Sequence, residues 1–398
     1  MRRTAVVAAA ISAMALASLT ACNGDSRTSA AKSSASAAAV PAAGVTVAVK
    51  NGSTGVSPTV PLEIAVTGGK LASVTVAAKG GTTVTGAVTE SADDPGSELW
   101  TPATKLDYGT TYTLTAKASN AAHKEATASS TFTTVTPTTL STPSVGPLGG
   151  TTVGVGMPIR VFFDQAVADR AAVQSHLKVT TSNPTDGAWS WMNDKEVHFR
   201  PSTYWPPNTK VTLDANLYGV DFGKGVWGQK NRTVSFQIGA KHVSVADAAT
   251  HMLAVYDGGK LVENYPMSAG SAKNPTRNGP HVVLQSYRRI TMDSSTFGLA
   301  VDAPGGYRAD VEYAVRISNN GEFVHGAPWS VGQQGSSNVS HGCINLSTSR
   351  AAWFYNFAQQ GDVVEVKNSV GPKLSSVDGD IYDWAIPWST WKAGSALK

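Results

Sequence analysis

A sequence pattern typical of a β-strand occurs twice in this chain, about 99 positions apart, and constrains the fold more than any other feature. The first copy, residues 106–114, alternates apolar and polar side chains after a turn, and residues 207–213 repeat the pattern. Pro102 and Pro201 keep the same offset. Since a β-sandwich needs about 100 residues, this spacing predicts two tandem sandwich modules.

The alternating pattern that defines the first module begins at Val45, and Gly-Gly pairs at 68–69 and 80–81 punctuate its runs. We predict immunoglobulin-like domains at residues 44–136 and 137–239, neither with an inter-sheet disulfide because neither contains cysteine. A charged fraction of only 15% beside 41% hydrophobic residues favours such modules. The net charge of +4 is too small to indicate nucleic-acid binding.

The N-terminus has the features of an exported protein. A basic start is followed by an apolar stretch, residues 5–19, and residues 19–22 resemble the lipobox of bacterial lipoproteins. We therefore expect a signal peptide at 1–21, lipidation of Cys22 and a Ser/Ala-rich tether at 22–43. Ordinary secretory cleavage is the alternative, and a transmembrane helix would need roughly 20 apolar residues. The rest of the chain is expected outside the cytoplasm, anchored to the membrane by lipid.

A third, β-rich unit is expected at residues 240–368. Residues 251–265 form a hairpin pattern around Asp-Gly, and one main helix is expected from Ser349 to about Gln360. Ser347 or Ser349 would cap this helix and Gly361 would end it. The predicted fold class is therefore mainly β: two immunoglobulin-like sandwiches, then a β-rich domain with one main helix.

Residues 369–398 form a tail rich in tryptophan, with Trp384, Trp388 and Trp391. We expect this tail to pack, through its apolar side chains, on the third unit or on the neighbouring module.

The lone cysteine outside the leader is the main candidate for chemistry. Cys343 lies in Ser-His-Gly-Cys-Ile-Asn-Leu, residues 340–346, and has no disulfide partner other than Cys22. In an oxidising compartment a free thiol is a hazard unless its reactivity is needed. His325 stands sixteen positions before His341 and can supply the base that a thiol nucleophile requires.

A thiol nucleophile also needs an oriented base and an oxyanion site. The Gly326 carbonyl could accept the other imidazole N–H, and an imidazolium at His325 would lower the thiol pKa. Gly342 permits a close turn, so the N–H groups of Gly342 and Cys343 could face the oxyanion. Two alternatives remain open: a buried structural cysteine, and a zinc site formed by His325, His341 and Cys343.

The long motif resembles the signature of the L,D-transpeptidases of bacterial cell walls, with the His-Gly-Ala-Pro-Trp segment at 325–329 as its upstream part. The resemblance covers residues 242–391, and the two preceding modules match the mycobacterial, actinobacterial type. It implies a catalytic domain at 240–368 with the tail, 369–398, packed on it. Gly326 replaces a serine found in some relatives.

The resemblance also implies roles for other residues. Tyr307 would line the pocket and assist the oxyanion site, His341 would be an auxiliary polar group, and Asn345 would order the loop or bind substrate. The remaining residues that we expect to form the pocket or contact the peptide stem are Met292, Trp329, Asn320, Gly321 and Ser340. Met292 and Trp329 could equally be plain core residues.

The implied reaction is acyl transfer without cofactor or metal. Cys343 would attack the third residue, a diaminopimelate, of a tetrapeptide stem and release D-alanine, with His325 as base and then acid. An amine of a second stem would resolve the thioester as a 3→3 cross-link, within the cell wall. Carbapenems are the expected inhibitors. Hydrolysis by an L,D-carboxypeptidase and a non-catalytic wall-binding lipoprotein are the alternatives. Both sandwiches are expected to act as spacers.

Overall fold

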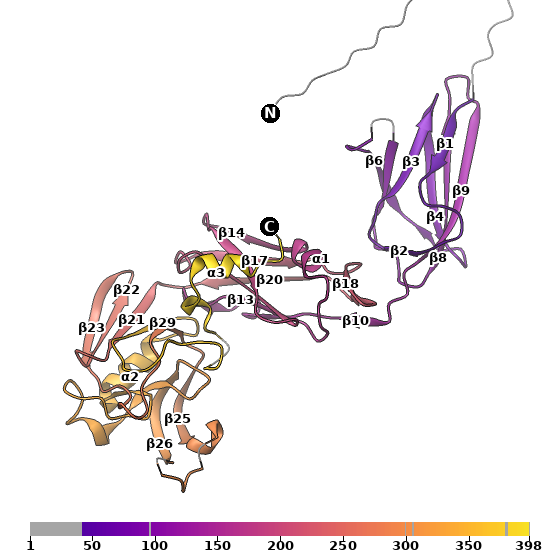
Figure 1. Ribbon diagram of the computed structural model, residues 1–398. Helices are drawn as coiled ribbons and strands as arrows, with labels where there is room; N and C mark the ends of the chain where they lie inside the picture. The colour runs from indigo at the N-terminus through magenta and orange to yellow at the C-terminus, as the bar shows by residue number, and fades with distance from the viewer. Residues whose placement is uncertain (1–41, 95–96, 299, 305, 379–380, 398) are drawn as a thin grey trace, which may run out of the picture.

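The computed structural model describes residues 42–397 except 95–96, 299, 305 and 379–380, and three β-rich modules follow one another along it (Figure 1). The mainly β fold class is thereby confirmed. The expected signal peptide, Cys22 and nearly all of the tether lie outside the described residues. Among the residues that are described, none of the helices has the length and apolar character that crossing a membrane requires.

The first sandwich pairs two sheets, ordered β1-β3-β7-β6 and β2-β9-β8-β4-β5. Its strands are β1 (Gly44–Val47), β2 (Ser53–Val56), β3 (Leu62–Thr67), β4 (Lys70–Ala78), β5 (Thr83–Val84), β6 (Gly86–Glu90), β7 (Ser97–Pro102), β8 (Thr111–Ser119) and β9 (Glu125–Thr134). Alternate residues of β8 are buried, because successive side chains of a strand point to opposite faces. Trp100 and Phe132 fill the core, and the Tyr112 hydroxyl accepts a hydrogen bond from Asp107 N–H at 2.9 Å. This contact forms the corner before β8.

The second sandwich has sheets ordered β11-β13-β16-β15 and β12-β20-β17-β14, with a small sheet β10-β19-β18. Its elements are β10 (Thr139–Ser141), β11 (Ser144–Gly146), β12 (Thr152–Val153), β13 (Ile159–Phe162), α1 (Arg170–Ser175), β14 (Leu177–Thr181), β15 (Gly187–Trp191), β16 (Glu196–Pro201), β17 (Lys210–Ala215), β18 (Asp221–Gly223), β19 (Val226–Gly228) and β20 (Arg232–Ile238). The repeated sequence pattern at 207–213 includes the start of β17, just as residues 106–114 include the start of β8.

The third module has two sheets, ordered β23-β22-β21-β29-β24 and β25-β26-β27-β28. Its elements are β21 (His242–Asp247), β22 (Met252–Asp257), β23 (Lys260–Pro266), β24 (Gly279–Val282), β25 (Gln285–Asp293), η1 (Ser294–Phe297), β26 (Arg308–Arg316), β27 (Phe323–Gly326), η2 (Pro328–Ser330), β28 (Ile344–Leu346), α2 (Thr348–Phe357) and β29 (Val363–Lys367). Helix α2 packs on β26 and β27 and thereby supports the strand that carries His325.

Helix α2 is shorter than the sequence predicts. Ser347 caps its start, but it ends at Phe357, since Ala358 is already extended (ψ 135°). Gly361 does not terminate the helix; with φ +94° it makes the turn into β29.

The C-terminal tail divides between two modules. Residues 369–378 lie on the third module, where Lys373 bridges to Asn278. Beyond them, η3 (Asp383–Ala385) contacts β24 of the third module and binds His198 of the second sandwich. Helix α3 (Trp388–Ala393) lies over the second sandwich, as the yellow segment of Figure 1 shows. Trp391 is fully buried and donates its indole N–H to the Ala188 carbonyl at 2.8 Å. Of the two surfaces that we expected for the tail, α3 uses the neighbouring module, where Trp391 finds apolar surface.

Candidate active site

Two neighbouring parallel strands, β27 and β28, bring the candidate nucleophile and base together. His325 pairs with Asn345 in the register, and Cys343 directly precedes β28. Since alternate residues of a strand share a face, His325, Asn345 and Cys343 project to the same side. All three line one cavity of about 440 Å³. His325 and Cys343 are only 3% and 5% exposed, so a substrate that reaches them leaves bulk water.

The tautomer of His325 is set by its own strand. Its Nδ1–H donates to the Gly326 carbonyl at 2.9 Å, the contact that the sequence led us to expect. The other ring nitrogen, Nε2, is then the one that can accept a proton. A side chain at position 326 takes no part in this contact, because the acceptor is the backbone carbonyl.

Burial keeps both candidate groups neutral at rest. Loss of solvation raises the pKa of the Cys343 thiol to about 12 and lowers the pKa of the His325 imidazole to about 4, although the Gly326 hydrogen bond acts in the opposite direction on His325. The expected imidazolium that depresses the thiol pKa is therefore wrong. The cavity is lined by a neutral thiol and a neutral imidazole, and the thiol proton must move when a substrate is attacked.

The loop before Cys343 is held by hydrogen bonds on both sides. The Ser340 hydroxyl donates to the Cys343 carbonyl at 2.6 Å and accepts the Gly342 N–H at 3.1 Å. Thr276 donates its hydroxyl to the Gly342 carbonyl at 2.8 Å. Gly342 has φ +119°, a conformation that residues with side chains rarely adopt. Because its N–H is bonded to Ser340, the expectation that Gly342 donates to an oxyanion is wrong in this conformation.

The cavity around Cys343 has aromatic and apolar walls. Met292, 7% exposed, packs in one cluster with Cys343 and Tyr307, whereas Trp329 is 61% exposed at the rim. The Tyr307 ring lies 5.1 Å from the exposed ring of His341. Burial, and then the nearby Cys343 sulfur, raise the pKa of Tyr307 to about 12, so its phenol is neutral. Tyr307 can therefore donate a hydrogen bond at physiological pH.

Asn345 is ordered by the loop that carries Trp329. Its side-chain amide donates to the Ser330 hydroxyl at 3.1 Å. Its Oδ1 is buried and has no hydrogen-bond partner among the described residues. The structure thus gives Asn345 a loop-ordering contact.

A second cavity, of about 400 Å³, meets the first at Tyr307 and His341. Asn320 and Gly321 line it, as expected for residues near the peptide stem. The Cys343 thiol donates to the Gly321 carbonyl at 3.6 Å, so the second cavity also begins close to the sulfur.

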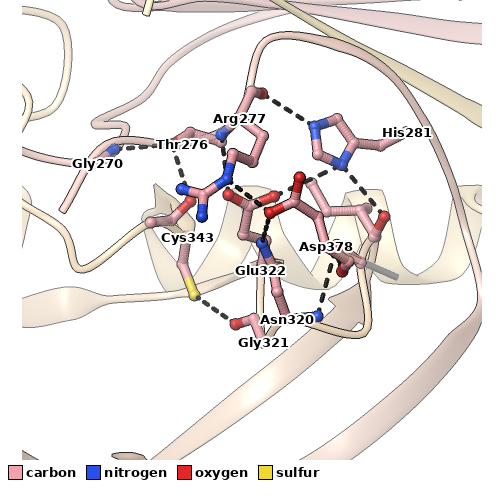
Figure 2. A network of polar contacts seen from close by, with 12 residues as sticks. Gly270, Thr276, Arg277, His281, Asn320, Gly321, Glu322, Cys343 and Asp378 are labelled. Atoms are coloured by element: carbon pink, nitrogen blue, oxygen red, sulfur yellow. Dashed lines mark hydrogen bonds and ion pairs between the residues drawn. The ribbon is translucent and has the colours of Figure 1, made fainter. Parts of the chain in front are cut away.

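Three charged residues of this region were not predicted from the sequence: Arg277, Glu322 and Asp378 (Figure 2). Glu322 is 4% exposed, and burial raises its pKa to about 8, although the Arg277 N–H that it accepts at 2.9 Å lowers it. An acidic residue immediately before the apolar strand β27 was the available signal. For Asp378, in the tail, the sequence offers no signal.

The described part of the chain contains no group of three or more His, Cys, Asp and Glu side chains arranged to hold a metal ion. The zinc alternative, which needs His325, His341 and Cys343 as ligands, therefore has no ligand set there.

Comparisons with known proteins agree with this architecture. A family profile described as a bacterial Ig domain matches residues 53–221, and one described as an L,D-transpeptidase catalytic domain matches residues 241–366. L,D-transpeptidase 2 of Mycobacterium tuberculosis is 43% identical over 88% of this chain and 85% of its own length. L,D-transpeptidase 5 of the same species is 39% identical over 86% of this chain and 74% of its own.

One solved structure, of the LD transpeptidase LdtMt1 in complex with imipenem, superposes with a TM-score of 0.50 at 36% sequence identity. The match covers 56% of this chain and 97% of that one.

Proposed function

The chain belongs to the L,D-transpeptidase family, as its motif predicted, and we propose that it forms 3→3 cross-links between peptidoglycan stems through a thioester on Cys343. The observation that carries the proposal is a buried thiol that shares one cavity with an imidazole whose tautomer is fixed by the Gly326 carbonyl. This pair supplies a nucleophile and a base without a carboxylate or a metal.

The acylation half begins with two neutral groups. His325 Nε2 takes the thiol proton as the sulfur attacks the carbonyl carbon of the third stem residue. The resulting oxyanion accepts hydrogen bonds from the Cys343 N–H and the Tyr307 phenol. When the C–N bond breaks, the imidazolium returns the proton to the amine of the leaving D-alanine, and a thioester remains.

The second half reverses these proton movements. The amine of an acceptor stem attacks the thioester carbon and gives a proton to His325, and the C–S bond breaks to restore the thiol. Two cavities that share Tyr307 and His341, the first lined by Cys343 and the second by its neighbour Gly342, support a reaction in which two stems approach one site. Water in place of the amine would give the carboxypeptidase reaction.

Inhibition and location follow from the same proposal. The imipenem complex of a relative supports β-lactam binding by this chain. A strained lactam carbonyl would acylate Cys343 and leave a bulky thioester that excludes the acceptor. We also propose that Cys22 is lipidated, which would anchor the enzyme to the outer face of the membrane with its active site in the wall.

The test is mass spectrometry of products from the purified ectodomain given a disaccharide-tetrapeptide. Dimers are expected, with D-alanine released. Tripeptide without dimer would assign the chain to hydrolysis. Unchanged substrate, under conditions where Cys343 is reduced, would support the non-catalytic alternative; Cys343→Ala is the control that must produce neither product.

A further inference from the structure

The first part of the tail, residues 369–378, runs beside the loops that surround Cys343. Asn278 donates its side-chain amide to the carbonyls of Ser369 and Gly371, at 2.8 and 2.7 Å. Leu374 N–H donates to the Asn278 carbonyl at 2.8 Å. The tail is thereby fixed next to segment 276–278, and this places Asp378 at the back of the active site.

We propose that Asp378 is a positioning residue for the reaction at Cys343, acting through Arg277 and the turn at 318–321. The proposal rests on the proposed acyl transfer, because it concerns the rate at which Cys343 is acylated. Asp378 touches neither of the two cavities, and its effect must pass through the residues that it binds.

Asp378 accepts hydrogen bonds on all three of its oxygen atoms. Its backbone carbonyl accepts the Ser318 hydroxyl at 2.7 Å and the Asn320 N–H at 2.9 Å. Its Oδ1 accepts Arg277 Nε at 2.7 Å, and its Oδ2 accepts the Ser375 N–H and hydroxyl, both at 3.0 Å. The side chain is 3% exposed. A carboxylate so buried and so fully bonded fixes the residues around it.

These bonds keep Asp378 ionised. Burial raises its pKa, but hydrogen bonds from Arg277 and Ser375 outweigh burial, so the pKa of Asp378 lies below its ordinary value. The charge faces the guanidinium of Arg277 and, from the neighbouring elements, the protonated Glu322. Arg277 lines the second cavity, so the ion pair also fixes one wall of that cavity.

One route from Asp378 to the sulfur runs through the turn. Ser318 and Asn320, both bonded to Asp378, bracket the turn that presents the Gly321 carbonyl. That carbonyl accepts the Cys343 thiol at 3.6 Å (Figure 2). If the turn shifts, the thiol loses this partner and the orientation of the Cys343 side chain in the cavity changes.

A second route runs through segment 276–277. Arg277 N–H donates to the Glu322 carboxyl at 2.9 Å, and Thr276 holds the Gly342 carbonyl at 2.8 Å. The Thr276 hydroxyl also accepts the Gly270 N–H, at 2.9 Å. The peptide next to Cys343 is therefore tied to the same segment whose guanidinium Asp378 holds. Both routes converge on the position of the sulfur.

The same tail offers a matched control. Asp383, five residues later, is fully buried and binds His198 of the second sandwich at 2.9 Å, with none of its bonds directed at the active site. Loss of its charge should loosen the tail on the sandwich without moving Arg277 or the 318–321 turn. Comparison of the two aspartates separates positioning from general stabilisation.

The experiment measures acylation of the whole ectodomain by imipenem, by intact mass over time, for wild type, Asp378→Ala, Asp378→Asn and Asp383→Asn, with melting temperatures. Asp378→Ala should lower the maximal acylation rate constant by about 100-fold, the scale of a misplaced reacting group, with a smaller change in the half-saturating concentration. Asp378→Asn, which keeps the size of the side chain, should fall between, and both substitutions leave the bonds of the backbone carbonyl in place. Asp383→Asn should lower the melting temperature and leave the rate constant within twofold of wild type.

Three results would overturn the positioning role: wild-type rate constants in both Asp378 variants, a loss confined to melting temperature, or an equal loss of rate in Asp383→Asn. If Asp378→Ala fails to fold, the acylation rate constants of Asp378→Asn and Ser318→Ala test the positioning role instead, since each of these substitutions removes fewer contacts. If wild type itself is not acylated, the proposed function fails rather than the role of Asp378.

Discussion

The two junctions between modules are built differently. The first sandwich meets the second through polar aromatic contacts: the Tyr108 hydroxyl donates to the Gly228 carbonyl at 2.7 Å and accepts the Gly219 N–H at 2.9 Å. Tyr218 donates back to the Leu106 carbonyl at 2.7 Å. The core of the first sandwich contains only its own residues. This junction joins two separately filled cores.

The second sandwich and the catalytic domain share a core. Val282 and Val363 of the catalytic domain, and Ile381 of the tail, belong to the same buried cluster as the centre of the second sandwich. Gly154 N–H donates to the Gln360 carbonyl at 2.8 Å, and a Cβ on Gly154 would collide with the backbone of residues 361 and 362. The two backbones touch here.

The tail reinforces this second junction. The guanidinium of Arg200 faces the rings of Trp384, Trp388 and Trp391, at 4.7, 5.1 and 4.6 Å. Cation–π contacts of a partly buried Arg stabilise by about 0.5–2 kcal/mol each. Two modules of the same kind are thus joined to their neighbours differently: the first has a core of its own, whereas the second shares its core with the catalytic domain. The spacer role of both modules stays a prediction.

Truncation should show the difference between the two junctions most strongly. A fragment of residues 240–398 exposes the shared cluster, and each large apolar side chain returned to water costs about 1.5–3 kcal/mol, so its total loss rivals the whole stability of a domain. We expect this fragment to be unfolded by circular dichroism. A fragment of residues 137–398 should keep its melting temperature within a few degrees and its acylation rate within twofold. A folded, active 240–398 fragment would contradict the shared core.

Trp391→Ala is the next largest test. The second sandwich and the catalytic domain, which share a core, are called the fused unit. Removal of a fully buried tryptophan should cost this unit about 3–5 kcal/mol of unfolding free energy. Denaturant unfolding measures this cost. Trp329→Ala, at a ring that is 61% exposed, is the matched control and should change stability by less than about 0.5 kcal/mol. Equal effects of both substitutions would show that the tail is not anchored as described.

The pH dependence of the second junction should be smaller. Burial lowers the pKa of His198, but Asp383 and Glu196 outweigh it and raise the pKa to about 9. A pKa above the unfolded value stabilises the fold fully below about pH 6.5, and this contribution is lost as pH rises toward 9. We expect the fused unit to lose roughly 2 kcal/mol across that window. Asp383→Asn should flatten the dependence of the unfolding free energy on pH. An unchanged slope in that variant would exclude the His198–Asp383 pair as the source of the pH dependence.

The smallest effect is expected at the first junction. Tyr108→Phe removes a hydroxyl that makes two hydrogen bonds, worth about 1–2 kcal/mol in contact free energy. Calorimetry should show the transition of the fused unit unchanged. If that transition moves by more than a few degrees, the first sandwich is coupled to the rest more tightly than its contacts indicate.

How far the sequence predicts this protein depends on how local each feature is. The tandem sandwiches, the Cys343 motif and the base His325 follow from spacing and from contiguous residues, and so does the bond from His325 to Gly326. The neutral state of the thiol does not, because the sign of its pKa shift depends on burial depth, which no motif encodes.

The contacts made by the tail could not be predicted from the sequence either. The tryptophans of the tail predict an apolar anchor but not the surface that receives it. Asp378 reaches Arg277, 101 positions earlier, and Asn320, 58 positions earlier, only because the chain returns to the back of the active site. Of these charged residues only Glu322 has a signal in the sequence, because it is a charge immediately before a buried strand.

The most direct test of the central claim is the pH profile of Cys343 acylation by imipenem, followed by intact mass and located by digestion. Cys343 as the nucleophile predicts one adduct, on the Cys343 peptide, and the thiol is neutral in a cavity that it shares with a base whose pKa is about 4. Its rate constant should be level from about pH 5 to 9, fall below about pH 4 and drop sharply at all pH values in His325→Ala. A rise through an apparent pKa of 6–7, as for an imidazolium–thiolate pair, or an adduct that persists in Cys343→Ala, would contradict the account.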